Sequence, residues 1–327
     1  MNHLSDLPSE ILIRITEFLF DRDILNLCTC SKHLAELRFA VKFIDRICFE
    51  IIFELPYFNS FTNITFGLLV RKISYPEISF PKSLRILGLY RQLRLPQFPT
   101  SLEILYVGGE YYQALSQLPT SLLHLCLGDK YNQPLPQLPT SLLGLSLGYC
   151  YDKPLPQLPD SLVHLSLGQT YNHPLLELPG LLQSLYLSSR YNQPLSPFPD
   201  SLLYLELSRN YNQPLAKLPS LLRHLKIGLY YDQPLPQLPD SLLKLILGNY
   251  YNHPFSKLPD LLQYLELGLR YNQPLPQLPN SLQKLILGYY YNQPLPQLSI
   301  SLTYIELSKE YKYPLLGFSS NLKIKWF

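Results

Sequence analysis

The residues of this chain that could perform chemistry recur at a fixed spacing. His124 and His164 are 40 residues apart, and so are Glu266 and Glu306. A histidine pair can ligate a metal ion, and a carboxylate pair about 6.5–9.5 Å apart acts in inverting glycosidases. If each pair lies on strands two places apart in a sheet, at about 4.8 Å per strand, its members are roughly 10 Å apart. That distance is too long for a shared metal ion and lies near the upper end of the glycosidase range.

Other features of the sequence argue against catalysis. Lys284 and Ile286, which the spacing places between the two glutamates, do not build the pocket of a catalytic acid. The chain contains no Ser/His/Asp order, no glycine-rich phosphate loop and no His-Glu-x-x-His motif. We therefore expect a protein that is not an enzyme and that needs no cofactor or metal ion.

Charge and cysteine usage narrow the class of protein. The net charge is +3 and the basic residues form no block, so nucleic acid is not expected as a partner. The five cysteines include Cys28 and Cys30 but no pairs at zinc spacing, which favours small core residues in a reducing compartment. The N-terminus lacks a signal-peptide pattern, and no apolar stretch reaches the roughly 18–20 residues of a membrane span. We expect a soluble, cytoplasmic chain without a membrane partner.

A repeat of 20 residues organises the chain from Tyr111 onward. Its common form is Tyr-Asn-Gln-Pro-Leu-Pro-Gln-Leu-Pro-x-Ser-Leu-x-x-Leu-x-Leu-Gly-x-x, and its tyrosines are Tyr111, Tyr131, Tyr151, Tyr171, Tyr191, Tyr211, Tyr231, Tyr251, Tyr271, Tyr291 and Tyr311. This period with Leu-x-x-Leu-x-Leu is typical of a leucine-rich solenoid, in which stacked repeats bury the apolar face that no single repeat can bury. The 31 prolines are in phase with the leucines, which indicates regular extended structure.

The half of each repeat that contains Leu-x-x-Leu-x-Leu is expected to form a short strand. Leu122, Leu125 and Leu127 keep their type from copy to copy while His124 and Cys126 between them change, which predicts one buried face. A glycine ends most of these strands, with serine at 188, 208 and 308, where a small or φ-permissive residue helps the chain turn.

The other half of the repeat cannot be a helix, because proline removes a backbone donor and keeps the preceding residue extended. We predict that residues 134–139 form a polyproline II segment with Leu135 and Leu138 pointing inward. The recurring tyrosine is expected to form a stacked column of buried rings, and the asparagine after it a hydrogen-bonded ladder. Since these residues are present in every copy, we interpret them as architecture rather than as a binding site.

The N-terminal residues 1–45 contain no repeat and have apolar residues at helical spacing. Pro8 suits the first turn of a helix, and Asp21 or Asp23 and then Ser31 can open two further helices. The pattern reads Leu4-x-x-Leu7-Pro8-x-Glu10-Ile11-Leu12-x-x-Ile15-x-x-Phe18-Leu19, then Asp23-Ile24-Leu25-x-Leu27. It resembles an F-box, with Leu34 where that family often has tryptophan. The resemblance implies docking on the Skp adaptor of a cullin–RING ubiquitin ligase through Leu7, Pro8, Ile11, Leu12, Ile15 and Leu25.

The repeats resemble the FNIP repeats, a leucine-rich-like family named for Phe-Asn-Ile-Pro. The corresponding tetrad is Tyr131-Asn132-Gln133-Pro134, so tyrosine and glutamine replace phenylalanine and isoleucine. An F-box followed by such repeats is similar to proteins of amoebae and of their giant DNA viruses. The resemblance leaves both a cellular and a viral origin open.

The variable strand positions are where we expect specificity, because the constant positions of a solenoid build its scaffold. They combine aromatic residues with charges of both signs, which suits a protein partner better than a polyanion. The target-binding residues predicted for the concave face are Tyr204, Glu206, His224, Lys226, Lys244, Tyr264, Glu266, Lys284, Tyr304 and Glu306. Two alternatives stay open: a strand face that is merely solvated, and a partner bound on the convex side.

These patterns predict a small all-α F-box followed by a leucine-rich-repeat-like β-solenoid with 20-residue rungs and an extended, polyproline-like convex side. The segments are residues 1–45 (F-box), 46–77 (folded connector and N-terminal cap), 78–320 (solenoid) and 321–327 (C-terminal capping strand). The expected function is that of a monomeric substrate-recognition adaptor, which holds an unknown target protein near a ubiquitin-conjugating enzyme. The alternative is a scaffold or decoy that binds its partner without causing degradation.

Overall fold

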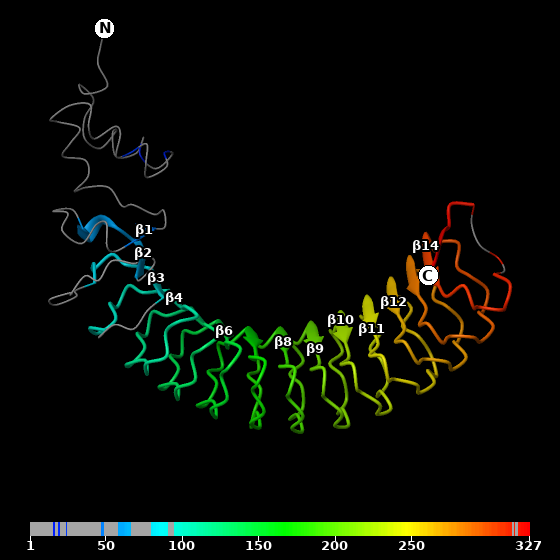
Figure 1. Cartoon of the computed structure of the whole chain (residues 1–327), viewed down its shortest axis with the longest axis horizontal. Helices are drawn as coiled ribbons and strands as arrows, with labels where there is room; N and C mark the ends of the chain where they lie inside the picture. The colour runs from blue at the N-terminus through cyan, green and yellow to red at the C-terminus, as the bar shows by residue number, and fades with distance from the viewer. Residues whose placement is uncertain are drawn as a thin grey trace, which may run out of the picture. The chain divides into compact units, whose positions relative to one another are not determined.

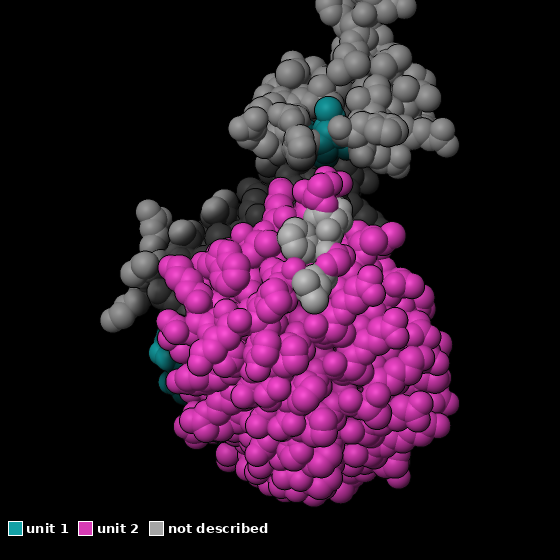
Figure 2. Space-filling view, turned by 90° about the vertical axis from the view of Figure 1, so that its right-hand side faces the viewer, with its two compact units in different colours: residues 1–142 teal, residues 143–327 magenta. Residues whose placement is uncertain are grey.

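The computed structural model of this chain describes residues 16, 19, 24, 47–48, 58–66, 80–90, 95–315, 317 and 320–327. The chain forms two compact units, Met1–Leu142 (unit 1) and Leu143–Phe327 (unit 2), shown as a ribbon in Figure 1 and coloured separately in Figure 2. The six expected adaptor contacts (Leu7, Pro8, Ile11, Leu12, Ile15 and Leu25) lie outside the described residues, as do most residues of the three expected helices. No helix in the described ranges has the length and apolar character needed to cross a bilayer.

Parallel strands pair in chain order in unit 1. They are β1 (Ile47–Cys48), β2 (Asn63–Phe66), β3 (Ile86–Leu89) and β4 (Ile104–Val107), followed by β5 (His124–Leu127), with the 3-10 helix η2 (Phe58–Ser60) before β2. The strands β1 and β2 lie within residues 46–77, and β2 pairs with β3 so that Ile64 is opposite Leu87. The parallel ladder therefore begins before the first recognisable repeat.

Unit 2 continues the same pattern of one short strand per repeat. Its strands are β6 (Gly144–Ser146), β7 (His164–Ser166), β8 (Ser184–Tyr186), β9 (Tyr204–Glu206), β10 (His224–Lys226), β11 (Lys244–Ile246), β12 (Tyr264–Glu266), β13 (Lys284–Ile286), β14 (Tyr304–Leu307) and β15 (Lys323–Trp326). Neighbouring strands are parallel, and Leu225 is opposite Leu245 in the next rung. The C-terminal strand β15 pairs with β14. A leucine-rich-repeat-like parallel β-solenoid with 20-residue rungs is therefore confirmed.

Leucines from the strand and from the return segment build the core of each rung. In the rung of β11, Leu245 and Leu247 are buried, as the alternation of side chains along a strand requires, and Leu242 before the strand is buried as well. Leu238 of the return segment is also buried, whereas Leu235 is half-buried. Between residues 95 and 315 the return segments contain neither helix nor strand, in agreement with their proline content.

Close approach between rungs explains the glycine at the end of a strand. A Cβ atom added to Gly248 would lie 1.7 Å from the carbonyl oxygen of Gly228 in the preceding rung. Positive φ occurs, within the described residues, at Gly317 alone. Where serine replaces glycine, its hydroxyl bonds the preceding rung, and Ser208 Oγ donates to the carbonyl oxygen of Tyr191 at 2.7 Å. The sequence predicted either a small or a φ-permissive residue at this position. The small size of glycine is therefore the correct explanation, and its conformational freedom is not.

The expected column of buried tyrosine rings is confirmed in unit 2. Rings from Tyr151 to Tyr311 stack on their neighbours with centroids 6.2–6.3 Å apart. Because hydrogen-bonded strands are only about 4.8 Å apart, rungs spread on the tyrosine side and the strands of unit 2 lie on its concave side (Figure 1). Burial raises the pKa of Tyr171 and of Tyr251 to about 12, since the phenolate would lose its hydration.

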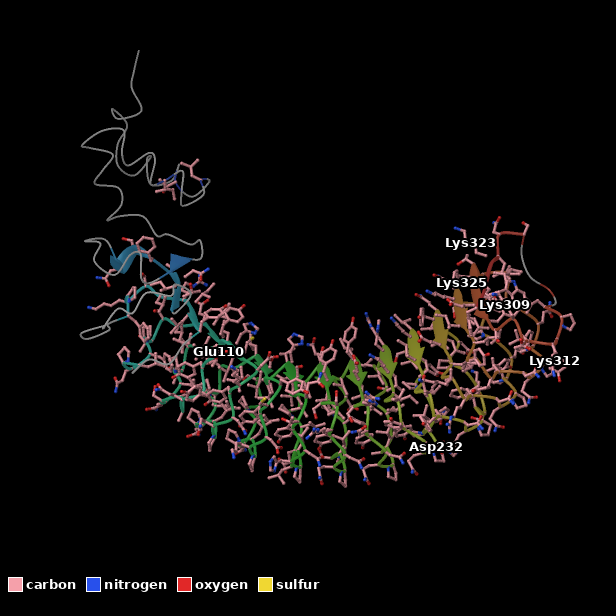
Figure 3. All side chains as sticks on the ribbon, viewed as in Figure 1. Glu110, Asp232, Lys309, Lys312, Lys323 and Lys325 are labelled. Atoms are coloured by element: carbon pink, nitrogen blue, oxygen red, sulfur yellow. The ribbon has the colours of Figure 1, made fainter. Side chains whose placement is uncertain are left out.

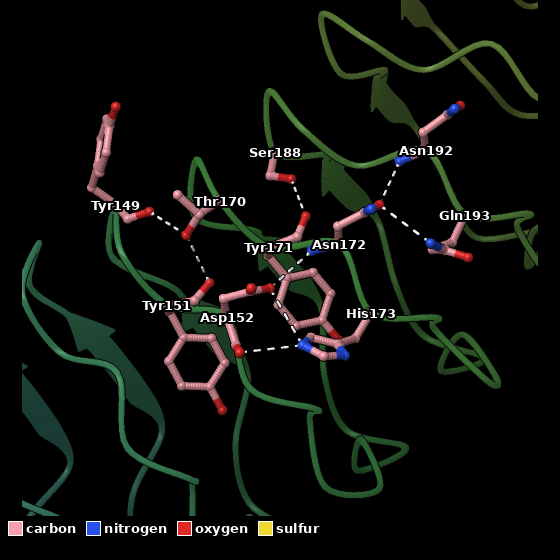
Figure 4. A network of polar contacts seen from close by, with 10 residues as sticks. All are labelled: Tyr149, Tyr151, Asp152, Thr170, Tyr171, Asn172, His173, Ser188, Asn192 and Gln193. Carbon is pink, nitrogen blue, oxygen red and sulfur yellow. Dashed lines mark hydrogen bonds and ion pairs between the residues drawn. The ribbon is translucent and has the colours of Figure 1, made fainter.

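The expected asparagine ladder is also present in unit 2. The backbone amide of Asn192 donates to Oδ1 of Asn172 at 2.9 Å, and Asp152 accepts in the same way from the amide of Asn172 at 3.4 Å (Figure 4). At the C-terminal end the amide of Lys312 donates to Oδ1 of Asn292 at 3.3 Å. A lysine side chain has no acceptor, so this ladder ends there.

Candidate functional site

The candidate site is the outward face of strands β9–β14 in unit 2. In β11 the central Leu245 is buried, which leaves Lys244 and Ile246 half-exposed on the opposite face. Parallel register then places Lys244 opposite Tyr264 on the next strand. We define the strand face as the outward residues of these strands: Tyr204, Glu206, His224, Lys226, Lys244, Ile246, Tyr264, Glu266, Lys284, Ile286, Tyr304 and Glu306. The structure thus brings the ten predicted target-binding residues together and adds two isoleucines.

An ion pair and a ring contact join β9 to β10 at the start of the strand face. Nζ of Lys226 lies 2.5 Å from Oε1 of Glu206. The rings of Tyr204 and His224 are tilted by 40° with centroids 4.6 Å apart. An exposed ion pair contributes only about 0–1 kcal/mol to stability, so its main effect here is to orient two long side chains.

A shallow cavity of about 270 Å³ opens on this part of the strand face. The buried Leu205 and Leu225 contribute to its lining, together with Tyr186, Tyr204, Glu206, His224, Lys226, Lys244 and Ile246. Burial lowers the pKa of His224, and the charges of Lys244 and Arg223 add to this effect, so the imidazole is favoured in its neutral form. Small-molecule sites usually measure about 300–1,000 Å³, so this cavity suits one side chain of a partner.

Lysines and tyrosines alternate along strands β11–β14. Nζ of Lys244 lies 4.7 Å from the ring centroid of Tyr264. Nζ of Lys284 lies between two rings, 5.3 Å from the centroid of Tyr264 and 4.7 Å from that of Tyr304. Cation–π contacts at exposed sites are worth about 0.5–1 kcal/mol each. Together they hold flexible lysines in a fixed array.

Hydrogen bonds within each strand fix the two glutamates of this array. The hydroxyl of Tyr264 donates to Glu266 at 2.6 Å, and that of Tyr304 donates to Glu306 at 2.8 Å. Nζ of Lys325 on β15 donates to the other oxygen of Glu306 at 2.8 Å. Figure 3 shows Lys325 beside the strands and Asp232 on the far side of the rungs.

The surroundings of Glu306 do not suit a general acid. The hydrogen bond from Lys325, and then that from Tyr304, lowers the pKa of Glu306 against the opposing effect of burial. A glycosidase acid needs a raised pKa instead, so that it is protonated at neutral pH. In the described part of the chain no three His, Cys, Asp or Glu side chains gather as metal ligands. Glu266 and Glu306 of the strand face are held by hydrogen bonds from tyrosine hydroxyls.

Sequence reasoning missed a second group of exposed side chains, on the turn after each strand. The rings of Tyr230 and Tyr250 have centroids 5.0 Å apart, and Cζ of Arg270 lies 4.1 Å from the centroid of Tyr250. The signal was present in the sequence as two variable residues before each repeated tyrosine. In unit 2 these positions often hold tyrosine or arginine.

Comparisons with known proteins agree with this architecture. The FNIP Repeat profile matches residues 131–170, 171–210, 211–250, 231–270, 251–290 and 271–309, a span of more than half of the chain. No curated protein sequence matches this chain. Among solved structures, CroV588, described as a novel circular LRR protein, is 31% identical with a TM-score of 0.67. That match covers 77% of this chain and 44% of CroV588, so the chain spans less than half the length of that relative.

A second solved structure shows the fold alone. The LRR protein LIC12759 of Leptospira interrogans is 21% identical with a TM-score of 0.54, over 91% of this chain and 87% of that one. Both structures are similar to this chain in having stacked leucine-rich rungs. The repeat solenoid and its family match suggest protein–protein binding.

Proposed function

Because this chain belongs to the FNIP repeat family, we propose that its solenoid binds a target protein on the strand face of unit 2. The observation that supports this proposal is the alternating series Lys244, Tyr264, Lys284 and Tyr304, held by cation–π contacts on adjacent strands. Tyrosine anchors among charges of both signs are typical of protein interfaces. The nearby cavity offers a place for one inserted side chain of the target.

The strand face is ordered before a partner arrives, which favours tight binding. Glu266 and Glu306 are held by tyrosine hydroxyls, and Lys284 lies against two rings. Fixing a flexible side chain at an interface costs about 0.5–1.5 kcal/mol. Side chains that are already held avoid part of that cost, and the hydrogen-bonded strands beneath them keep their spacing.

We further propose that residues 1–45 dock on the Skp adaptor of a cullin–RING ubiquitin ligase. The support is the sequence alone: Leu7-Pro8-x-Glu10-Ile11-Leu12 and then Asp23-Ile24-Leu25 resemble an F-box. In this proposal the chain is a monomeric, cytoplasmic substrate-recognition subunit, in the host cytoplasm if the gene is viral. It would perform no chemistry of its own and would raise the effective concentration of target lysines near the conjugating enzyme.

An alternative uses the same strand face without degradation. The solenoid would then sequester or scaffold its partner, and the N-terminal segment would serve only as a handle. The half-life of the captured target distinguishes the two functions. It falls when a ligase adaptor is expressed, and it does not change when a scaffold is expressed.

The first experiment is capture from cell extract with the intact chain and with the variant Leu7→Asp plus Pro8→Ala. We expect the intact chain to retain the Skp adaptor and cullin, and the variant to lose both. No capture by an intact chain with a normal circular dichroism spectrum would exclude the ligase role and would leave the binding solenoid.

The strand face is tested separately in the same extract. Tyr264→Ala plus Lys284→Ala is expected to lose the target while it keeps the Skp adaptor. Lys217→Ala, an exposed lysine of a return segment, is the control and should keep both. Capture of the same proteins by the strand-face variant and the control would show that the target binds elsewhere.

A further inference from the structure

The turns that follow β9, β10, β11 and β12 carry a continuous row of exposed side chains. We call this row the turn ridge and define it as Arg209, Tyr230, Tyr250 and Arg270, one residue from each consecutive rung. The two tyrosines are 39% and 37% exposed although each is a large apolar ring. These four residues belong to the turns and not to the strand face.

The four side chains are in contact from one end of the turn ridge to the other. Cζ of Arg209 lies 5.7 Å from the ring centroid of Tyr230, the rings of Tyr230 and Tyr250 are 5.0 Å apart, and Cζ of Arg270 lies 4.1 Å from the centroid of Tyr250. Each ring therefore has one aromatic and one guanidinium neighbour. The order is cation, ring, ring, cation.

The backbone beneath the turn ridge is hydrogen-bonded from rung to rung. The amide of Tyr230 donates to the carbonyl of Arg209 at 3.0 Å, and that of Tyr250 donates to the carbonyl of Leu229 at 3.1 Å. The amide of Arg270 donates to the carbonyl of Asn249 at 2.9 Å. The turns thus form a second ladder beside the strands, which fixes the spacing of the side chains.

The charge of the turn ridge is positive and uncompensated within the described part of the chain. Neither Arg209 nor Arg270 forms an ion pair with a described residue. The six turns at 189–190, 209–210, 229–230, 249–250, 269–270 and 289–290 contain three arginines and no acidic residue. A guanidinium stacked on a ring still presents its N–H edge, which binds carboxylates in a bidentate way.

We propose that the turn ridge binds an acidic segment of a partner protein. Carboxylates of that segment would accept hydrogen bonds from Arg209 and Arg270, and its apolar atoms would cover Tyr230 and Tyr250. The arginines are three rungs apart, or roughly 15–18 Å at about 5–6 Å per rung. An extended segment spans that distance with about five residues, so the two acidic groups should be about five residues apart.

The stacking within the turn ridge favours a carboxylate ligand over a nucleic acid. A single-stranded nucleic acid binds by stacking its bases on open aromatic faces. Here the rings of Tyr230 and Tyr250 already contact each other at a tilt of 49°, and one guanidinium group lies over each ring. The turn ridge therefore presents guanidinium N–H donors that are supported by two apolar rings. This surface is distinct from the strand face, so the proposal does not rest on the proposed function.

The test is fluorescence anisotropy with the full chain and a fluorescein-labelled peptide that has two Asp-Glu pairs about five residues apart. The matched probe has Asn-Gln in place of each pair. We expect the acidic peptide to bind and its amide counterpart to bind at least about tenfold more weakly, because charged hydrogen bonds are lost. Arg209→Gln plus Arg270→Gln should weaken binding of the acidic peptide by a similar factor.

The control removes two positive charges that lie outside both the turn ridge and the strand face. Lys217→Gln plus Lys312→Gln, at two exposed lysines, should change the affinity by less than about twofold, since only screened long-range attraction is lost there. Equal losses in both double variants would overturn the proposal, as would no binding of the acidic peptide up to about 1 mM. Tighter binding of single-stranded oligouridylate than of the peptide would also overturn it. Circular dichroism checks that each variant keeps its fold.

Discussion

The backbone amide of Asn212 donates a hydrogen bond of 2.9 Å to Oδ1 of Asn192, which lies 20 residues earlier in the chain. Asn212 in turn accepts from the amide of Asp232 at the same distance. Here a side chain of one rung holds the backbone of the next. This relationship lets a chain with short strands, and with no helix between them in residues 95–315, keep a constant register.

Asn212→Ala should destabilise the solenoid by about 0.5–1.5 kcal/mol, because the amide of Asp232 loses its protein acceptor. Asn212→Asp keeps an acceptor at that position and should cost less. The midpoint of urea unfolding measures both. If the alanine and aspartate variants were equally affected, the hydrogen bond would not be the source of the loss.

Tyr191 tests the ring column. Tyr191→Ala should cost about 3–5 kcal/mol, because it removes a fully buried ring and leaves a cavity. Tyr191→Phe keeps the ring and loses only the long hydrogen bond of 3.4 Å from the amide of Leu175, so it should cost about 1 kcal/mol or less. Comparable losses of stability in the two variants would show that the hydroxyl, and not the stacking of the ring, makes the main contribution to stability.

Alkaline pH should unfold the solenoid cooperatively. Burial raises the folded-state pKa of Tyr111, Tyr171 and Tyr251 to about 12, above the ordinary value of 10.0. Because the folded pKa is the higher one, this stability is fully present below pH 10 and is lost as pH rises toward 12. Absorbance at about 295 nm should show the buried tyrosines ionising together with the loss of circular dichroism. Ionisation of all tyrosines near pH 10 without unfolding would contradict this.

Leu247→Asp should be severely destabilising. It removes roughly 1.5–3 kcal/mol of leucine burial and places a carboxylate where the side chain is 4% exposed. Lys244→Ala, on the outward face of strand β11, which ends just before Leu247, should change stability by less than about 1 kcal/mol, since it loses one exposed cation–π contact. Thermal unfolding of the pair checks which face of the strand is inside, and equally mild effects would be incompatible with the observed register.

Two glycines provide a matched test of the contact between rungs. Gly248→Ala would place Cβ at 1.7 Å from a backbone oxygen, so neighbouring rungs must separate and stability should fall by about 1–3 kcal/mol. Gly180→Ala meets no atom within 4 Å and should be neutral or stabilising by up to about 1 kcal/mol. Denaturant unfolding distinguishes them. A harmless Gly248→Ala would mean that the rungs are more widely spaced there.

The sequence predicted the strand, the buried leucines, the ring column and the asparagine ladder, because each depends on one residue type recurring every 20 positions. When Tyr191 meets Tyr211, identical neighbours in identical conformations must stack, so the repeat alone determines the contact. The outward position of Lys244 followed from strand alternation in the same way. The six adaptor contacts between Leu7 and Leu25 lie outside the described residues and stay a prediction.

Only the tertiary structure decided how unlike residues meet across rungs. Lys284 lies between Tyr264 and Tyr304, and Arg270 stacks on Tyr250, although each pair is 20 residues apart. Such contacts depend on rotamers and on the local distance between rungs, which a repeat pattern does not specify. The distance between rungs is wider at the tyrosines than at the strands, and this difference determines which side of unit 2 is concave. The close approach of the rungs where the strands end explains why small residues stand there.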